Sequence, residues 1–528
     1  MKNNKFIILI LSLVLLTTWS CRDFEELKQN SNVPNNVSPS MLLKTVLYKL
    51  HRAPSTMDER RGQYYLCNYD YYGNNRYDFG AGEELYTTIT NVVKMEEEAK
   101  RLGLPDRNVY SALGKFLKAY FFSTMSLQMG DIPMSEALKG AANMKPKYDT
   151  QKEVFNQCFT LLEEANTDIT ALIGSTTGGE LSGDFYFAND LKQWQKTVNT
   201  FRLRLLIHLS KKESDATLNI KKQFSDIVSN PTKYPIMTSS SDDLKFVYLY
   251  PSNLYPKNPG NFGFDALRYN SSATYVKLLT NHKDPRVFVT CEPADSLNNI
   301  TSDTTFASFA GANPGEDLGI MGVNAGKGLY SLINRYRYYR TYTGEPSLEL
   351  SFTETCFTIA EAINRGWLAT GPVGDAEAYY TAGIKASMAT YGIPEKGNFT
   401  AYFFKNNAKI SEEVNVAYKS YSIPFDFSKY YAQDSVKYAG NNAAGLTQIL
   451  KQKYIALYQH AGLESYFTYR RTGVPSFSVG AGTGNSGRIP LRFQYFSTED
   501  DVNLENYTTA IERYAKKDDI NGKMWLLE

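Results

Sequence analysis

The 528-residue chain has few of the side chains from which metal and redox sites are built. It contains four histidines and five cysteines, and no two cysteines form a CxxC pair. Zinc sites need such ligands at short, regular spacing, so we expect neither a metal nor a cofactor. The HExxH motif of metalloproteases and the GxSxG motif of serine hydrolases are also missing. No motif favours catalysis, and we expect a protein that is not an enzyme.

The chain also has almost no net charge. It carries 57 Lys and Arg against 55 Asp and Glu, and without Lys2 and Lys5 the balance is 55 to 55. Nucleic-acid binding needs a basic surface, so we expect no nucleic-acid partner. Beyond residues 6–16 no apolar run approaches the roughly 20 residues that cross a bilayer.

What is present begins at the N-terminus. Two lysines precede the apolar run, and Ser20 lies directly before Cys21. A basic start, a short apolar core and a small residue at the cut are typical of a secretory signal. We therefore interpret residues 1–20 as a lipoprotein signal peptide and Cys21 as the lipidated residue. Because Trp19 departs from the usual lipobox, ordinary secretion with an incidental cysteine stays open.

Helical periodicity dominates the rest of the chain. Residues 21–40 are rich in Asn, Ser and Pro and predict a tether, followed by a single domain over 41–528. Apolar residues at helical spacing predict a mainly α fold. Between about 230 and 347, Gly, Asn, Pro, Ser and Tyr predict a loop-rich insertion with few short strands, one of them near Phe246–Tyr250. The expected helices cover residues 84–102, 107–129, 150–171, 190–210, 215–228, 271–280, 348–365, 375–391, 446–459 and 464–469. A further helix is expected to run to about Arg52 with Ser40 as its cap, and Thr150 and Glu153 are in register for a capping box at the start of 150–171.

These helices fall into pairs, which favours tetratricopeptide-like stacking. The expected pairs are 84–102 with 107–129, 150–171 with 190–210, and 348–365 with 375–391. Because no clean 34-residue period is present, an irregular helical bundle is the alternative.

Tyrosine is the residue that stands out. Six of the fourteen positions from Tyr64 to Tyr77 are Tyr, and a second cluster with interleaved arginines runs from Tyr330 to Tyr342. Neither segment has helical periodicity. A flat ring can cover the apolar face of a sugar while hydroxyl, amide and guanidinium groups bind its hydroxyls. We select as candidate ligand-binding residues Tyr69, Tyr71, Tyr72, Asn74, Tyr77, Tyr336, Tyr338 and Tyr339.

Two other interpretations of the clusters remain. The arginines could bind the carboxylate of a peptide or of an acidic sugar. The rings could instead pack loops onto the helical core or form a protein interface, where Tyr and Arg are also enriched.

Motifs along nearly the whole chain resemble one family. Residues 130–137, Gly-Asp-Ile-Pro-Met-Ser-Glu-Ala, are similar to a signature of SusD/RagB-type (SusD-like) nutrient-binding outer-membrane lipoproteins of Bacteroidetes. Further resemblance follows in order at Trp194-Gln195-Lys196, Asp284-Pro285-Arg286, Ala360-Glu361-Ala362, Gln452-Lys453-Tyr454, Arg470-Arg471-Thr472-Gly473 and Ile489-Pro490-Leu491-Arg492.

The resemblance implies four tetratricopeptide-like helix pairs that support a loop-rich half. It implies a lipid-anchored protein on the outer face of the outer membrane, without catalysis. It also implies that the protein is a lid on a SusC-like TonB-dependent transporter. The lid captures a nutrient outside the cell and closes over it. We expect an oligosaccharide ligand, with a peptide as the first alternative and a surface hydrolase as the second. The acidic cluster Asp23, Glu25 and Glu26 resembles an export tag of such lipoproteins, although a solvated tether explains it equally well.

Overall fold

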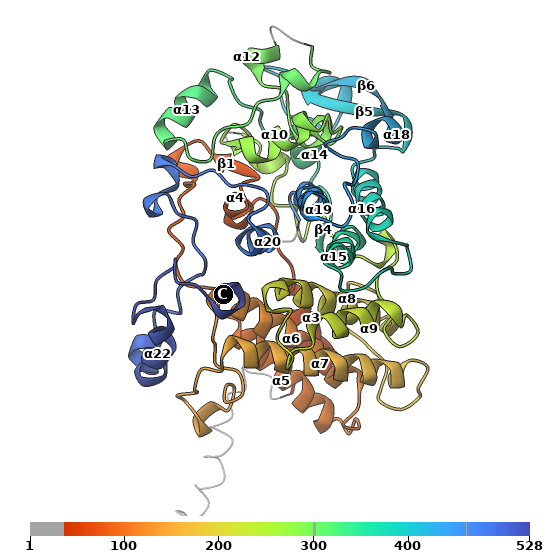
Figure 1. Cartoon of the computed structure of the whole chain (residues 1–528), viewed down its shortest axis with the longest axis vertical. Coiled ribbons are helices and arrows are strands. Elements are labelled where there is room, and N and C mark those ends of the chain that lie inside the picture. Colours follow the sequence, from red (N-terminus) through yellow and green to blue (C-terminus); the bar gives the residue numbers. More distant parts are fainter. Residues whose placement is uncertain (1–35, 264, 299–301, 461) are drawn as a thin grey trace, which may run out of the picture.

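The computed structural model describes residues 36–263, 265–298, 302–460 and 462–528. Cys21, the signal peptide and the acidic cluster lie outside these residues. The described chain is mainly α-helical, as predicted, and is built from two halves stacked along the long axis (Figure 1). None of the described helices combines the length and the apolar character that crossing a membrane requires.

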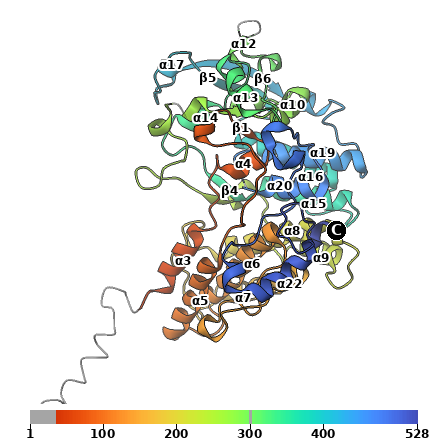
Figure 2. The ribbon, with the colours of Figure 1, turned by 90° about the vertical axis from the view of Figure 1, so that its left-hand side faces the viewer.

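The lower half is a stack of paired helices (Figures 1 and 2). Neighbouring helices pack in the order α3–α5–α6–α7–α8–α9. Two of the predicted pairs are therefore confirmed, α5 with α6 and α7 with α8. The bounds are α3 Pro39–Tyr48, α5 Tyr86–Arg101, α6 Val109–Met129, α7 Gln151–Leu172, α8 Leu191–His208 and α9 Ile220–Ser229.

Local signals explain where these helices begin. Thr150 and Glu153 form the predicted capping box at the start of α7, each side chain satisfying the other residue's backbone N–H. Ser38, not the predicted Ser40, caps α3 by accepting from the N–H of Met41, because Pro39 occupies the first helical position.

The upper half holds the third predicted pair, α15 with α16, and α19 packs against both. The returning C-terminal segment packs on the lower half, where its last turn contacts α7. The main helices are α10 Ala273–Asn281, α13 Leu318–Gly326, α15 Phe352–Asn364, α16 Ala376–Thr390, α19 Ala443–Ala456, α20 Glu464–Thr472 and α22 Leu504–Ile511. Shorter helices are α4 Met57–Arg61, α11 Val287–Thr290, α12 Asp295–Asn298, α14 Arg335–Tyr339, α17 Val414–Ala417, α18 Phe427–Tyr431 and α21 Glu499–Val502.

Three two-stranded antiparallel ribbons complete the upper half. They pair β1 with β3, β2 with β4 and β5 with β6; the bounds are β1 Tyr65–Cys67, β2 Leu244–Phe246, β3 Tyr269–Ser271, β4 Ser347–Leu350, β5 Lys396–Phe404 and β6 Tyr418–Asp426.

The strands correct two expectations. The helix predicted from residue 348 begins only at Phe352, because residues 347–350 pair with β2 and Ser351 caps the helix by accepting from the N–H of Glu354. The Tyr330–Tyr342 cluster, which shows no helical period, contains the short helix α14. The β5–β6 hairpin was not predicted.

Buried charges join the two halves. Arg204 of α8 donates to Glu354 of α15 at 2.9 Å and to the carbonyl of Glu349 at 2.7 Å. His208 of α8 lies 3.0 Å from Glu464 of α20. Burial lowers the pKa of His208, despite the opposing effect of Glu464, so the imidazole is neutral at pH 7.

A second buried group sits beside this network. Glu361 of α15 is fully buried and accepts from Arg471 of α20 at 2.9 Å and from Arg365 at 2.8 Å. Burial alone would raise the pKa of Glu361, but Arg471, Arg365 and Lys453 together outweigh it and lower that pKa to about 2. The pair therefore favours the charged carboxylate in the folded state.

We expect Glu361→Gln to destabilise the protein by about 3 kcal/mol at pH 7. The pKa of Glu361 is lower in the folded state than in the unfolded state. Its carboxylate therefore stabilises the fold at pH values above the unfolded pKa of about 4.3. This contribution to the free energy of unfolding is lost as the pH falls towards 2. The urea midpoints of the variant and the wild type should therefore lie closer together at pH 3 than at pH 7. Glu164→Gln, at a half-exposed carboxylate, is the control and should change little. If Glu361→Gln lost the same stability relative to the wild type at both pH values, the stabilising role of the Glu361 charge would be contradicted.

Candidate ligand-binding site

The first tyrosine cluster forms a loop at the end of β1. Its exposed part, residues 68–74, is here called the aromatic loop. The loop leaves the β1–β3 ribbon at Asn68, whose N–H donates to the carbonyl of Arg268 at 3.0 Å. The amide of Asn68 also donates to the carbonyl of Leu267 at 3.0 Å and to the side chain of Asn270 at 3.0 Å. The buried start of the loop is therefore fixed by three hydrogen bonds.

The aromatic loop presents three tyrosine rings side by side. Tyr71 is 82% exposed and Tyr69 is 46% exposed, whereas Tyr72 is half-buried between them. The ring centroid of Tyr72 lies 5.3 Å from that of Tyr71 and 6.3 Å from that of Tyr69. The guanidinium of Arg268 lies 4.5 Å from the Tyr69 ring. Neighbouring exposed aromatic rings can mark a ligand or partner site.

The far end of the aromatic loop is held by Arg60 of α4. Its guanidinium donates to the carbonyl of Asn74 at 2.8 Å. Gly73 has a φ of +129°, and a Cβ there would lie 2.6 Å from the same guanidinium, so only glycine fits. Asn75 closes the loop with two 2.8 Å hydrogen bonds to the backbone of Cys67. Asn74, another predicted site residue, is exposed next to the rings.

A cavity of about 280 Å³ opens beside the aromatic loop. Asn68 and Arg268 form one wall, and residues 322–328 at the end of α13 form another. A Cβ on Gly322 would lie 2.9 Å from the carbonyl oxygen of Asn68, so glycine allows α13 to approach the loop. We call this space the glycine-lined cavity; its size is near the lower limit of small-molecule sites.

The polar groups of the glycine-lined cavity are mainly hydrogen-bond donors. Arg335 is 8% exposed, and its closest carboxylate contact is with Glu292, whose oxygen lies 3.5 Å from its Nε. Tyr330 donates to Glu316 at 2.7 Å, and burial followed by this hydrogen bond raises the pKa of the phenol. Asp295 is the one carboxylate among the described lining residues. Hydrolysis of a glycosidic bond needs two opposed carboxyls, so the lining favours binding.

The remaining predicted tyrosines lie mostly in the core. Tyr77 is 2% exposed and its hydroxyl accepts from Gln63 at 2.8 Å. Tyr338 is fully buried, and Tyr339 donates to Asp265 at 2.8 Å beneath the surface. Tyr336 is half-buried and stacks on Tyr402 of β5 at 4.0 Å. In this structure these four rings pack loops onto the core, one of the alternatives that the sequence left open.

The eight predicted side chains thus lie in different places. Three exposed residues, Tyr69, Tyr71 and Asn74, and the half-buried Tyr72 belong to the aromatic loop. The tyrosines of α14 lie outside this loop. Arg335, at the start of α14, does reach the glycine-lined cavity together with Asn68. The sequence did not single out Arg268, because this residue follows no aromatic run. Its guanidinium contacts the Tyr69 ring only because two three-residue strands, β1 and β3, pair with each other.

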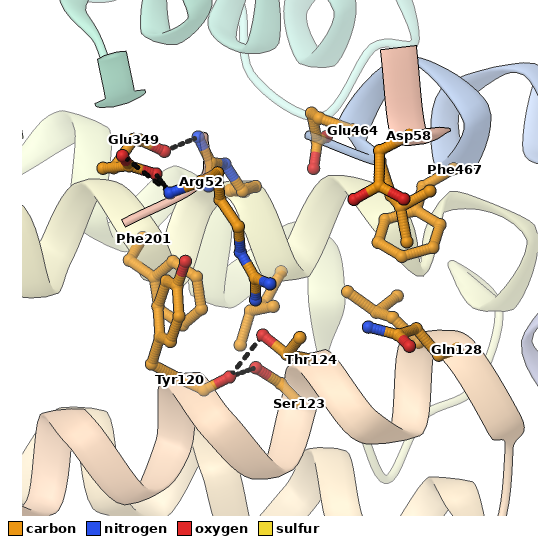
Figure 3. A pocket seen from close by; sticks show the side chains of 14 residues that line it. Arg52, Asp58, Tyr120, Ser123, Thr124, Gln128, Phe201, Glu349, Glu464 and Phe467 are labelled. Atoms are coloured by element: carbon orange, nitrogen blue, oxygen red, sulfur yellow. Dashed lines mark hydrogen bonds between the residues drawn. The ribbon is translucent and has the colours of Figure 1, made fainter. Parts of the chain in front are cut away.

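Two other cavities have a different character. The one in Figure 3 lies between the halves, holds about 50 Å³ and is lined by buried charges including Arg52, Glu349 and Glu464. That volume suits a few water molecules, not a sugar. An apolar cavity of about 170 Å³ lies beside α15, and Lys196 at its edge pairs with Asp242 at 2.6 Å. Among the described residues no group of three or more His, Cys, Asp or Glu could hold a metal ion.

Comparisons with known proteins agree with this architecture. A SusD-like family model, described as starch-binding and associating with the outer membrane, matches residues 31–496. A SusD homologue from Bacteroides fragilis is 28% identical, with 93% of this chain and 100% of that chain covered and a TM-score of 0.78. An outer-membrane protein of Bacteroides vulgatus, described in connection with nutrient binding, is 26% identical over 93% and 100%, with a TM-score of 0.76.

A more distant structure shares the fold. The chitin-binding SusD homologue from Flavobacterium johnsoniae is 21% identical, with 93% of this chain and 98% of that chain covered and a TM-score of 0.68. No curated protein matches the sequence.

Proposed function

Because the chain belongs to the SusD-like family of nutrient- and carbohydrate-binding outer-membrane proteins, we propose that it captures an oligosaccharide at the cell surface. The protein is a lipoprotein anchored through Cys21, with residues 21–40 as the tether. It delivers the glycan to a SusC-like TonB-dependent transporter and closes over that transporter as a lid. The family membership supports the nutrient class, and the aromatic loop supports the site.

The observation that carries the glycan assignment is the exposed group of three rings. Tyr69 and Tyr71 offer flat apolar faces to solvent, and Arg268 holds the Tyr69 ring from one side. The glycine-lined cavity next to them supplies guanidinium, amide and carboxylate groups for sugar hydroxyls. Apolar walls with a few polar groups are what ligand sites commonly combine. The chitin-binding homologue with the same fold also supports a glycan.

We expect Tyr69→Ala, Tyr71→Ala and Tyr72→Ala, combined in one variant, to weaken glycan binding by more than about 1 kcal/mol, or about fivefold. The rings stack on the sugar, and their exposure means that folding is kept. Affinity gels with a panel of polysaccharides, followed by calorimetry on the best ligand, measure the loss. Tyr48→Ala is the matched control, since Tyr48 is 52% exposed on α3 in the other half.

Three results of that screen would contradict the proposal. An unchanged affinity in the triple variant would reject the aromatic loop as the site. Saturable binding of peptides and of no glycan would reassign the ligand class. Release of shortened sugars from the polysaccharide would identify a hydrolase.

We expect Cys21→Ala to release the protein from the membrane, because the described residues contain no helix that could span it. The acyl chains on Cys21 are then the anchor. Cell fractionation, with protease treatment of intact cells, measures the change. Trp19→Gly keeps the cysteine and should stay anchored. Persistence of Cys21→Ala on the cell surface would contradict lipidation as the anchor.

A further inference from the structure

A second cleft of the upper half is lined by two lysines and, among its described lining residues, by no carboxylate. It is a groove of about 300 Å³ between α10, α19 and residues 475–478. The two helices contact each other in the upper half of the molecule (Figure 1). Lys277 and Leu278 of α10 form one wall, and Lys451 of α19 stands on the other. We call this space the lysine groove.

The two ammonium groups of the lysine groove have no opposing carboxylate. The described lining contains no Asp or Glu. Within the part of the chain that the structure describes, Lys277 is exposed and Lys451 is half-buried, and neither forms an ion pair. Two like charges that line one groove repel each other, and an anion bound between them offsets this repulsion.

Three of the cations that line the other cavities lie near a carboxylate. Lys196 beside the apolar cavity pairs with Asp242 at 2.6 Å, and Arg52 in the cavity of Figure 3 pairs with Glu83 at 2.6 Å. In the glycine-lined cavity, Arg335 has Glu292 at 3.5 Å. The mature chain is formally neutral, so an uncompensated pair of lysines is not a consequence of an overall positive charge.

The other lining groups suit a hydroxylated ligand. The groove is lined by further hydroxyl and amide side chains, namely Thr274, Asn281, Asn313, Ser476 and Ser478. The exposed ones among them can donate to and accept from hydroxyl groups. A lysine ammonium acts on carboxylate, sulfate or phosphate as a compact point charge. The lining therefore matches a small hydroxylated group that carries an oxyanion.

A buried amide braces the wall of the lysine groove. Gln63 is fully buried and accepts from Thr274 at 2.8 Å and from the N–H of Ser478 at 3.0 Å. The same amide donates to the hydroxyl of Tyr77, a core residue, at 2.8 Å. Gln63 thus ties two lining residues of the groove to the core, so the lysine groove is built into the fold.

We infer that the lysine groove is a second binding site, which takes the carboxylate or sulfate group of an acidic saccharide. Lys277 and Lys451 bind the oxyanion from opposite walls, and the amides and hydroxyls bind the sugar. This inference rests on the proposed function only in assigning the anion to a saccharide. The anion site itself depends on the two lysines and not on the tyrosine rings.

The test uses the full-length mature protein and the variant Lys277→Ala with Lys451→Ala. Calorimetry with tri-galacturonate, a sulfated galactose oligosaccharide and neutral maltotriose separates carboxylate, sulfate and uncharged ligands. Sodium sulfate tests the ion alone. Lys139→Ala with Lys192→Ala is the matched control, because it removes the same charge from exposed lysines of the lower half. We expect the groove variant to lose about tenfold or more in affinity for an acidic probe, and the control to keep it.

A further variant separates this site from the aromatic one. Tyr69, Tyr71 and Tyr72 changed together to Ala should keep the binding of sodium sulfate, whereas the groove variant should keep the binding of a neutral glycan. Three results would overturn the inference: no acidic probe binds the wild type, the groove variant binds such probes as tightly as the wild type, or both lysine pairs lose affinity equally. If only the triple tyrosine variant loses the binding of a neutral glycan, that result bears on the proposed function and not on the lysine groove.

Discussion

The structure depends on buried charges that meet between its two halves. Arg204 of α8 in the lower half pairs with Glu354 of the upper half, and Lys453 lies 3.6 Å from Glu354 and 3.7 Å from Glu464. The imidazole of His208, also on α8, lies 3.0 Å from Glu464. Each charge is costly to bury alone, and the cost is offset only when all partners are present. The network therefore specifies one arrangement of the halves, and that arrangement holds the loops of the upper half in place.

In the proposed function, the rigid upper half carries the binding site. The helices carry the core, while the aromatic loop, the end of α13 and the start of α14 meet around the glycine-lined cavity. Asn68, Arg60 and Asn75 hold the loop through hydrogen bonds to backbone groups. Loops held by a helical scaffold are where binding residues concentrate, because they can vary without changing the core.

Much of the fold was predictable from local patterns. The three predicted helix pairs and the capping box at Thr150 are signals within one or two turns, and the structure confirms them. A few short strands were predicted, one of them near Phe246–Tyr250, and the structure has β2 ending at Phe246. The partners of β1, β2 and β3 were not predicted, because each of these strands is three residues long and exists only through distant pairing. The β5–β6 hairpin did carry a signal, since Phe399, Ala401 and Phe403 are buried at alternate positions. Composition located the tyrosine clusters, but only tertiary packing separates exposed Tyr71 from buried Tyr338.

Hydrogen–deuterium exchange with and without the best-binding glycan tests the central claim, capture at the aromatic loop, most directly. We expect slower exchange in residues 68–74 and 318–330, because a ligand there orders the loop against α13 and excludes water from the glycine-lined cavity. Exchange in the buried helices α6 and α8 should not change. Protection confined to other segments, with residues 68–74 unchanged at saturating glycan, would contradict the claim.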